Sequence, residues 1–217
     1  MHRQPDSDGM MPDNESTLTR RLPAHTGNQE KIVIVSGLPR SGTSMLMHVL
    51  QAGGMTLLTD DVRRPDIDNP KGYCEFERVK RLPQGDVEWL EEARGKCLKV
   101  VSALLVYLPP GYSYNVIFMH RDIGEVLASQ HKMLARRGQE TRDDDEAMMV
   151  SLQKHADEVR HWAVTQPNFS LLDADYNAIL AAPAHWVARI NAFLGGNLDT
   201  LAMQAAVDST LYRNRRS

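Results

Sequence analysis

The stretch Gly37-Leu38-Pro39-Arg40-Ser41-Gly42-Thr43-Ser44 has the residue types and spacing of a phosphate-binding loop. It follows an apolar run at 32–35 and precedes a helical pattern of apolar residues. A turn of this kind exposes backbone N–H groups, and the start of the following helix adds partial positive charge. A P-loop would carry lysine directly after its second glycine, but Thr43 stands there, and the nearest cation is Arg40. The segment therefore predicts an anion cradle without the usual lysine.

A second candidate anion site lies at the end of another apolar run, at 116–119. Arg121 follows this run, and Ser129 lies about two helical turns further along a predicted helix. In open α/β sheets ligands collect beyond the carboxyl ends of the strands, so Arg121 and the loop are expected to face one crevice. A guanidinium and a hydroxyl together suit a second phosphate. Taken alone, an arginine at a strand end would more often pair with a surface carboxylate.

The elements that must position these residues alternate between strand and helix. Buried apolar runs predict strands, and amphipathic patterns with glycine or proline at their ends predict helices. The predicted strands are 31–36, 98–101, 115–120 and 169–172; the predicted helices are 41–52, part of 79–94, 122–137, a long helix from the Asp143-x-x-Glu146 capping box to 165, and 183–194. This order predicts an α/β fold, a P-loop-type three-layer α/β/α arrangement with a mostly parallel sheet.

Length and composition limit the classes of protein to consider. The chain has 217 residues, enough for one α/β domain, which we place at 30–217 after a polar, flexible N-terminal arm at 1–29. A net charge of -3 argues against a nucleic-acid partner bound through the whole surface. No apolar run has the ~20 residues of a membrane span, and no signal peptide is evident, so we expect a cytoplasmic protein. Cys74 and Cys97 lack metal-type spacing and are expected to be reduced structural thiols.

The two anion motifs together resemble the PAPS-dependent sulfotransferases, which use 3′-phosphoadenosine 5′-phosphosulfate. The loop is closest to the P-R-S-G-T-T form of the tyrosylprotein and bacterial members, and Arg121 and Ser129 have the family's Arg-x7-Ser spacing. Weaker similarities are the segments 69–75, 175–177 and 190–195. The resemblance implies that PAPS is the co-substrate, that its product PAP (3′-phosphoadenosine 5′-phosphate) is released, and that no metal is required. It implies the following donor-binding residues: Pro39, Arg40, Ser41, Gly42, Thr43 and Ser44 for the 5′-phosphosulfate, and Arg121 and Ser129 for the 3′-phosphate.

The resemblance also suggests catalytic residues. Arg40 would stabilise the charge that grows on the leaving phosphate oxygen. The acceptor's proton must pass to a carboxylate or a histidine. In the tyrosylprotein sulfotransferases the base is a glutamate. An alignment of the loop motifs without gaps places that position on Asp61, with Asp60 beside it. Glu75 is the rival candidate, and His120 is a weaker one.

Other functions stay open at this point. A P-loop kinase for a small molecule or nucleotide would use a similar cradle, and so would a catalytically inactive nucleotide-binding protein. Small-molecule, glycan and peptide acceptors all stay open, and the long polar segment 59–81 is expected to shape the acceptor's pocket. The oligomeric state is not predicted. The basic residues at 212–216 would form a solvated tail or close over the donor.

Overall fold

The protein is built around a four-stranded parallel sheet. The computed structural model describes residues 30–60, 62–63, 66, 69, 72–136, 138–139 and 144–207. Its strands are β1 (Ile32–Gly37), β2 (Cys97–Lys99), β3 (Tyr114–His120) and β4 (Phe169–Asp175). They are ordered β2-β1-β3-β4, and each neighbouring pair is parallel. The predicted α/β class with a parallel sheet is confirmed, whereas the predicted arm at 1–29 and the basic segment at 212–216 lie outside the described residues.

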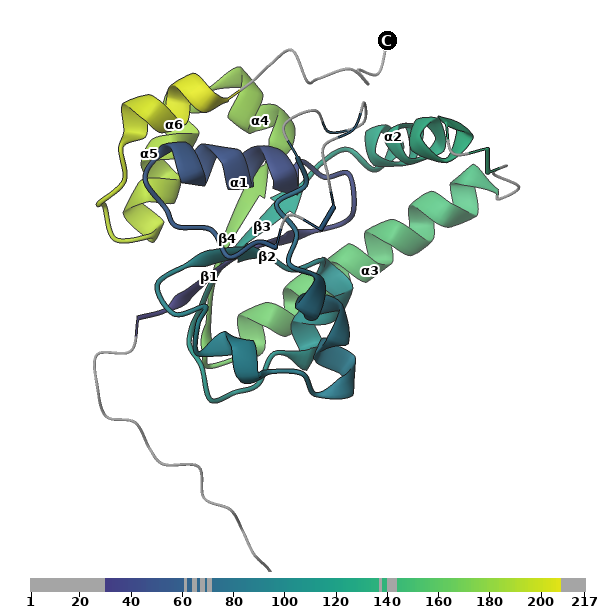
Figure 1. The fold of residues 1–217 in the computed structure, drawn as a ribbon. Helices are drawn as coiled ribbons and strands as arrows, with labels where there is room; N and C mark the ends of the chain where they lie inside the picture. Colours follow the sequence, from purple (N-terminus) through teal and green to yellow (C-terminus); the bar gives the residue numbers. More distant parts are fainter. Residues whose placement is uncertain are drawn as a thin grey trace, which may run out of the picture.

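Helices cover both faces of the sheet, as the alternation of strand residues requires (Figure 1). Val33 and Val35 pack toward α1 (Thr43–Ala52), α4 (Tyr176–Ala181), α5 (Pro183–Phe193) and α6 (Thr200–Ala206). Ile32 and Ile34 belong to the opposite core, with α3 (Asp145–Thr165) and the short 3-10 helices η1 (Glu77–Gln84), η2 (Glu88–Leu90) and η3 (Ser102–Tyr107). Each fully buried aliphatic side chain contributes about 1.5–3 kcal/mol, so both helical layers are held by the apolar strands. The predicted three-layer arrangement is therefore confirmed.

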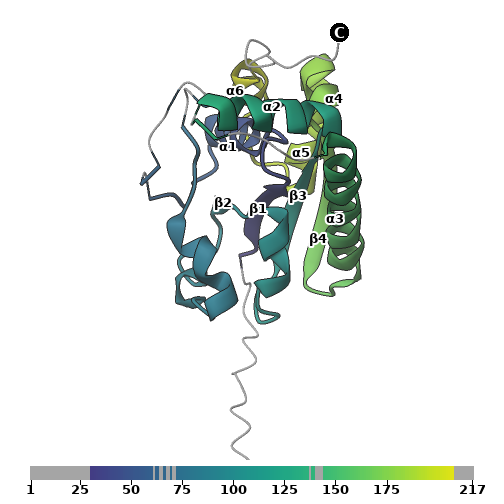
Figure 2. The ribbon, with the colours of Figure 1, turned by 90° about the vertical axis from the view of Figure 1, so that its right-hand side faces the viewer.

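The strand register brings the carboxyl ends of β1, β2 and β3 to the same end of the sheet. Gly37 pairs with Met119, and Val35 pairs with Lys99. The segments that follow β1, β2 and β3 therefore emerge side by side. Helix α2 (Ile123–Arg136) follows β3 and lies on this same side of the molecule (Figure 2).

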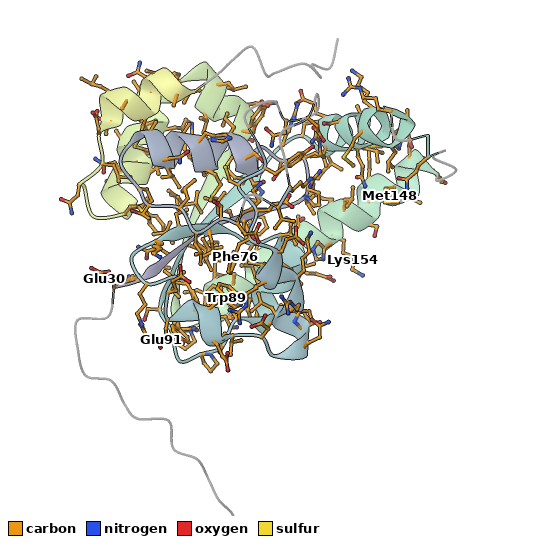
Figure 3. The ribbon with its side chains drawn as sticks, viewed as in Figure 1. Glu30, Phe76, Trp89, Glu91, Met148 and Lys154 are labelled. Atoms are coloured by element: carbon orange, nitrogen blue, oxygen red, sulfur yellow. The ribbon has the colours of Figure 1, made fainter. Side chains whose placement is uncertain are left out.

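The segment predicted to be a broken helix is a pair of 3-10 helices. Gly85, with a φ of 82°, caps η1 two residues after Pro83, as the predicted break near 83–85 requires. Phe76 and Trp89, on either side of η1, pack edge to face with ring centroids 5.4 Å apart. Figure 3 shows these two rings together beneath the sheet. The contact fixes the segment against the core.

The long helix α3 begins one residue later than its predicted capping box. The N-cap is Asp144, whose Oδ1 accepts the N–H groups of Glu146 and Ala147 at 3.0 and 3.4 Å. Asp143, the predicted cap, lies outside the described residues. Asp144 is the residue whose carboxylate reaches both N–H groups of the first turn. Among the described residues, no helix combines the length and the apolar character that crossing a membrane requires.

Candidate functional site

The anion loop occupies residues 38–42, between the end of β1 at Gly37 and the start of α1 at Thr43. The loop folds back on itself, because Ser41 donates its hydroxyl to the Leu38 carbonyl oxygen at 2.7 Å and its N–H to the same oxygen at 3.2 Å. The first turn of α1 leaves its backbone N–H groups without intrahelical partners, and they point toward the loop. The predicted strand–loop–helix context of the motif is therefore present.

Both glycines of the motif, Gly37 and Gly42, occupy positions where a side chain would clash. Gly42 has a φ of 96°, and a Cβ built there would lie 2.3 Å from the Tyr176 ring. Gly37 has a φ of 145°, and its Cβ would lie 2.6 Å from the Met119 carbonyl oxygen. Arg40, between them, also has a positive φ of 75°, which is rare for a residue with a Cβ. The loop thus combines close backbone approach with a strained residue, a combination that is common at binding sites.

The structure brings Arg40, Ser129 and Arg121 together, although they come from the loop, α2 and the end of β3. Arg40 Nε donates to Ser129 Oγ at 2.9 Å, and Arg121 Nη1 donates to the Arg40 carbonyl oxygen at 3.3 Å. The Arg121 guanidinium also lies over the Tyr176 ring, 4.6 Å from its centroid. Arg121 Nε donates to Glu125 Oε2 at 2.9 Å. The two predicted anion motifs therefore form one continuous group.

A cavity of about 280 Å³ lies beside this group. Ser41 of the loop and Arg121 both line it, together with His120 at the end of β3. Its remaining walls come from Leu38, the end of β3, the start of α2, the middle of α3 and Asp175 at the end of β4. The lining divides evenly between apolar side chains and polar or charged ones, so the cavity offers several hydrogen-bonding groups to a ligand.

Lys99 is the functional candidate that sequence reasoning missed. It is the last residue of β2 and is only 7% exposed. Its Nζ donates to Ser44 Oγ at 2.8 Å and to the Tyr73 carbonyl oxygen. Burial lowers the pKa of Lys99 to about 8, and the nearby Arg63 and Arg40 act in the same direction, while Glu75 and Cys74 oppose them. A buried ammonium therefore contacts the first turn of α1, directly after the anion loop.

A sequence signal for Lys99 was available. The lysine stands between Leu98 and Val100, inside an otherwise apolar run. Lysine is rarely buried unless it is paired, so a lysine within such a run is informative. Its position one strand away from the loop becomes evident only when β2 is known to pair with β1.

The three candidate carboxylates differ in their surroundings. Asp61 lies outside the described residues. Asp60 accepts the N–H of Glu77 through Oδ2 at 2.5 Å and the N–H of Val62 through Oδ1 at 3.2 Å. Both of its carboxylate oxygens therefore bind backbone N–H groups. Glu75 accepts from Arg63 Nη1 at 2.9 Å. Glu75 is also close enough to Lys99 to raise its pKa against the effect of burial. Glu75 is thus a described carboxylate that lies beside both Arg63 and Lys99.

The candidate His120, and His48 on α1, each lie against a partner of their own. His48 Nε2 lies 3.3 Å from the Gly72 carbonyl oxygen and 3.6 Å from the Cys74 sulfur. His120 Nε2 lies 2.7 Å from Asp173 Oδ1 on the neighbouring strand β4. Within the described residues, no group of three or more His, Cys, Asp or Glu side chains is arranged to hold a metal ion.

The sequence matches no protein-family model and no curated protein. Its structure is similar to that of the mouse sulfotransferase SULT7A1 complexed with PAP, with a TM-score of 0.55 and 16% sequence identity over 87% of this chain and 69% of that chain. It is also similar to the sulfotransferase domain of the Synechococcus PCC 7002 olefin synthase, with a TM-score of 0.52 and 16% identity over 88% of this chain and 82% of that domain. The chain therefore has the sulfotransferase fold that the resemblance of its motifs predicts.

Proposed function

We propose that the protein transfers a sulfuryl group from PAPS to a hydroxyl or amine acceptor. The observation that carries the proposal is the hydrogen bond of 2.9 Å between Arg40 and Ser129. It joins the anion loop to the second anion motif, so a donor with two separated phosphates can contact both. The fold shared with a PAP-complexed sulfotransferase supports the same assignment.

The chemistry of the site favours sulfuryl over phosphoryl transfer. ATP has no 3′-phosphate and would leave Arg121 and Ser129 unused. A transferring sulfuryl group carries less negative charge than a phosphoryl group, so it needs less of the charge neutralisation that Mg²⁺ supplies in kinases. Asp122, the second residue after β3, accepts the N–H of Glu125 at 3.0 Å and so caps the start of α2. These features support a metal-free reaction.

In the proposed reaction Arg40 and Lys99 stabilise the oxygen that leaves the sulfur. The acceptor oxygen or nitrogen forms a new bond to sulfur as the bond between sulfur and the 5′-phosphate oxygen breaks. Negative charge then grows on that phosphate oxygen, where two cations and the N–H groups of the loop are most effective. We assign Pro39, Ser41, Gly42, Thr43 and Ser44 to binding of the 5′-phosphate.

We propose Glu75 as the base that takes the acceptor's proton. A base must lie within hydrogen-bond reach of the acceptor and must be ionised before the reaction. Glu75 is held by Arg63 and lies near Lys99, whereas Asp60 is occupied by two backbone N–H groups. Asp61 is a base candidate on the resemblance alone. The acceptor is a small molecule, a glycan or a peptide.

Two measurements test this function. The first is calorimetric titration with PAP in the presence of EDTA, where we expect binding that does not depend on a metal. The second is transfer of radiolabelled sulfate from PAPS to a panel of phenols, alcohols, sugars and tyrosine peptides. Phosphoryl transfer from ATP that requires Mg²⁺, without binding of PAP, would show the protein to be a kinase. Binding of PAP without transfer to any acceptor would show an inactive nucleotide-binding protein.

A further inference from the structure

Arg121 and Glu125 form a buried ion pair at the start of α2. Their side chains are 7% and 5% exposed, and Arg121 Nε lies 2.9 Å from Glu125 Oε2. The backbone of Glu125 is fixed as well, because Asp122 Oδ1 accepts its N–H at 3.0 Å. The backbone that carries this carboxylate is therefore held in place independently of the contact with Arg121.

The guanidinium of Arg121 is held in one orientation by groups on several sides. Glu125 binds its Nε edge, the Arg40 carbonyl oxygen accepts from Nη1 at 3.3 Å, and the Tyr176 ring lies 4.6 Å from its face. A guanidinium recognises phosphate through a planar fork, so its orientation decides how well its hydrogen bonds form. Fixing the Nε edge also fixes the direction of the opposite edge of the plane.

The negative charge of Glu125 weakens anion binding, whereas its orienting contact favours it. A carboxylate beside Arg121 cancels part of its attraction for a phosphate, although it makes burial of the arginine tolerable. Arg121 lines the cavity, so a ligand in that space can reach it. Any benefit of this carboxylate to phosphate binding therefore comes from the orientation that it gives Arg121, and not from its charge.

We propose that Glu125 is a positioning residue that orients Arg121 and thereby sets the selectivity of the site for a 3′-phosphorylated nucleotide. The inference rests on the proposed function, in which Arg121 binds the 3′-phosphate. Selectivity here is the ratio of the dissociation constants of AMP and PAP, because these nucleotides differ only in the 3′-phosphate.

Two substitutions separate orientation from charge. Glu125→Asp keeps the charge, but its side chain is one methylene shorter and cannot hold Nε in the same place. Glu125→Gln keeps the length and an oxygen that accepts from Nε, but it removes the charge. Orientation predicts that Glu125→Asp lowers the selectivity about tenfold or more, the effect of losing one charge-assisted hydrogen bond, and that Glu125→Gln retains it.

The test is calorimetry with PAP and with AMP on the full chain and on both variants. Glu158→Gln is the matched control, because it breaks an i,i+4 ion pair with Lys154 on the exposed face of α3. A loss of selectivity in Glu125→Gln with none in Glu125→Asp would overturn the inference, because orientation predicts the opposite order. Unchanged selectivity in both variants would reduce Glu125 to a structural residue. Failure of the unsubstituted protein to bind PAP would instead contradict the proposed function.

Discussion

Replacing Lys99 with methionine separates the catalytic value of this lysine from its cost to folding. Methionine has a similar length and no charge, so it fills the space that the lysine side chain occupies. If the ammonium stabilises the leaving oxygen, its loss removes about 2.7–4 kcal/mol of transition-state stabilisation, by analogy with the removal of one oxyanion donor. We expect kcat to fall on the order of 10²–10³-fold in the sulfate-transfer assay.

The same substitution removes the free-energy cost of burying the charged Lys99 side chain in the folded state. Burial lowers the pKa of Lys99 from 10.5 to about 8, which corresponds to about 3 kcal/mol at about 1.4 kcal/mol per pH unit. The unfolded chain holds this proton more tightly than the folded chain does. The cost is therefore present in full below about pH 8 and disappears as the pH rises to 10.5.

Methionine also leaves the Ser44 hydroxyl and the Tyr73 carbonyl without the ammonium, at a cost of about 1–3 kcal/mol. The two effects offset each other, so we expect the free energy of unfolding at neutral pH to change by less than about 2 kcal/mol. The clearer signature is the pH dependence. Across the window from about pH 8 to 10.5, the unsubstituted protein should gain stability relative to Lys99→Met.

The assay combines urea unfolding across this pH window with steady-state kinetics. Lys96→Met serves as the control, because Lys96 lies close by in the chain and makes an exposed ion pair with Glu92. We expect the control to leave both kcat and the pH dependence unchanged. A Lys99→Met enzyme with turnover within threefold of the unsubstituted protein would refute the role of the ammonium, and an unaltered difference in stability across the window would refute its buried charge.

Three further predictions concern the loop and the base. Arg40→Ala should lower kcat about 10²-fold while the dissociation constant of PAP changes much less; equal losses in calorimetry and kinetics would leave Arg40 a binding role only. Gly42→Ala should lower the free energy of unfolding by about 2 kcal/mol or more, because its Cβ would lie 2.3 Å from the Tyr176 ring, and an unchanged urea midpoint would contradict the loop geometry. Glu75→Gln should lower kcat about 10²-fold or more with little effect on stability, whereas Asp60→Asn should chiefly lower stability; the reverse result would move the base from Glu75 to Asp60.

The sheet was largely predictable from local sequence, because its strands are unbroken apolar runs. The run at 116–119 and the run at 32–35 each lie within a strand, and glycine or proline marks most helix ends. The helices α4 and α6 were not predicted. They have 6 and 7 residues, so an amphipathic pattern has little length in which to appear. Each is capped by an aspartate, Asp175 and Asp199, which is a signal that could have been read.

The site was predictable in part only, because pairing between distant residues decides the roles of its side chains. The loop and Arg121 carry recognisable spacings, but the contact of Arg40 with Ser129 spans 89 positions of the chain. Asp60 resembled a free loop carboxylate until its two backbone partners were known. Lys99 was missed because its importance comes from the neighbouring strand and not from its own segment.

Strand β2 has a consequence for how the site would fail under stress. It has 3 residues, lies at the edge of the sheet, and pairs with β1 at three positions, with one further bridge from Leu57 to Cys97. Elements with few ladder hydrogen bonds open at a lower free energy than the whole domain. Lys99 is carried by this weakly paired edge, while the anion loop follows the central strand β1. Warming should therefore detach the ammonium from the loop while the rest of the sheet stays folded, so that inactivation precedes unfolding.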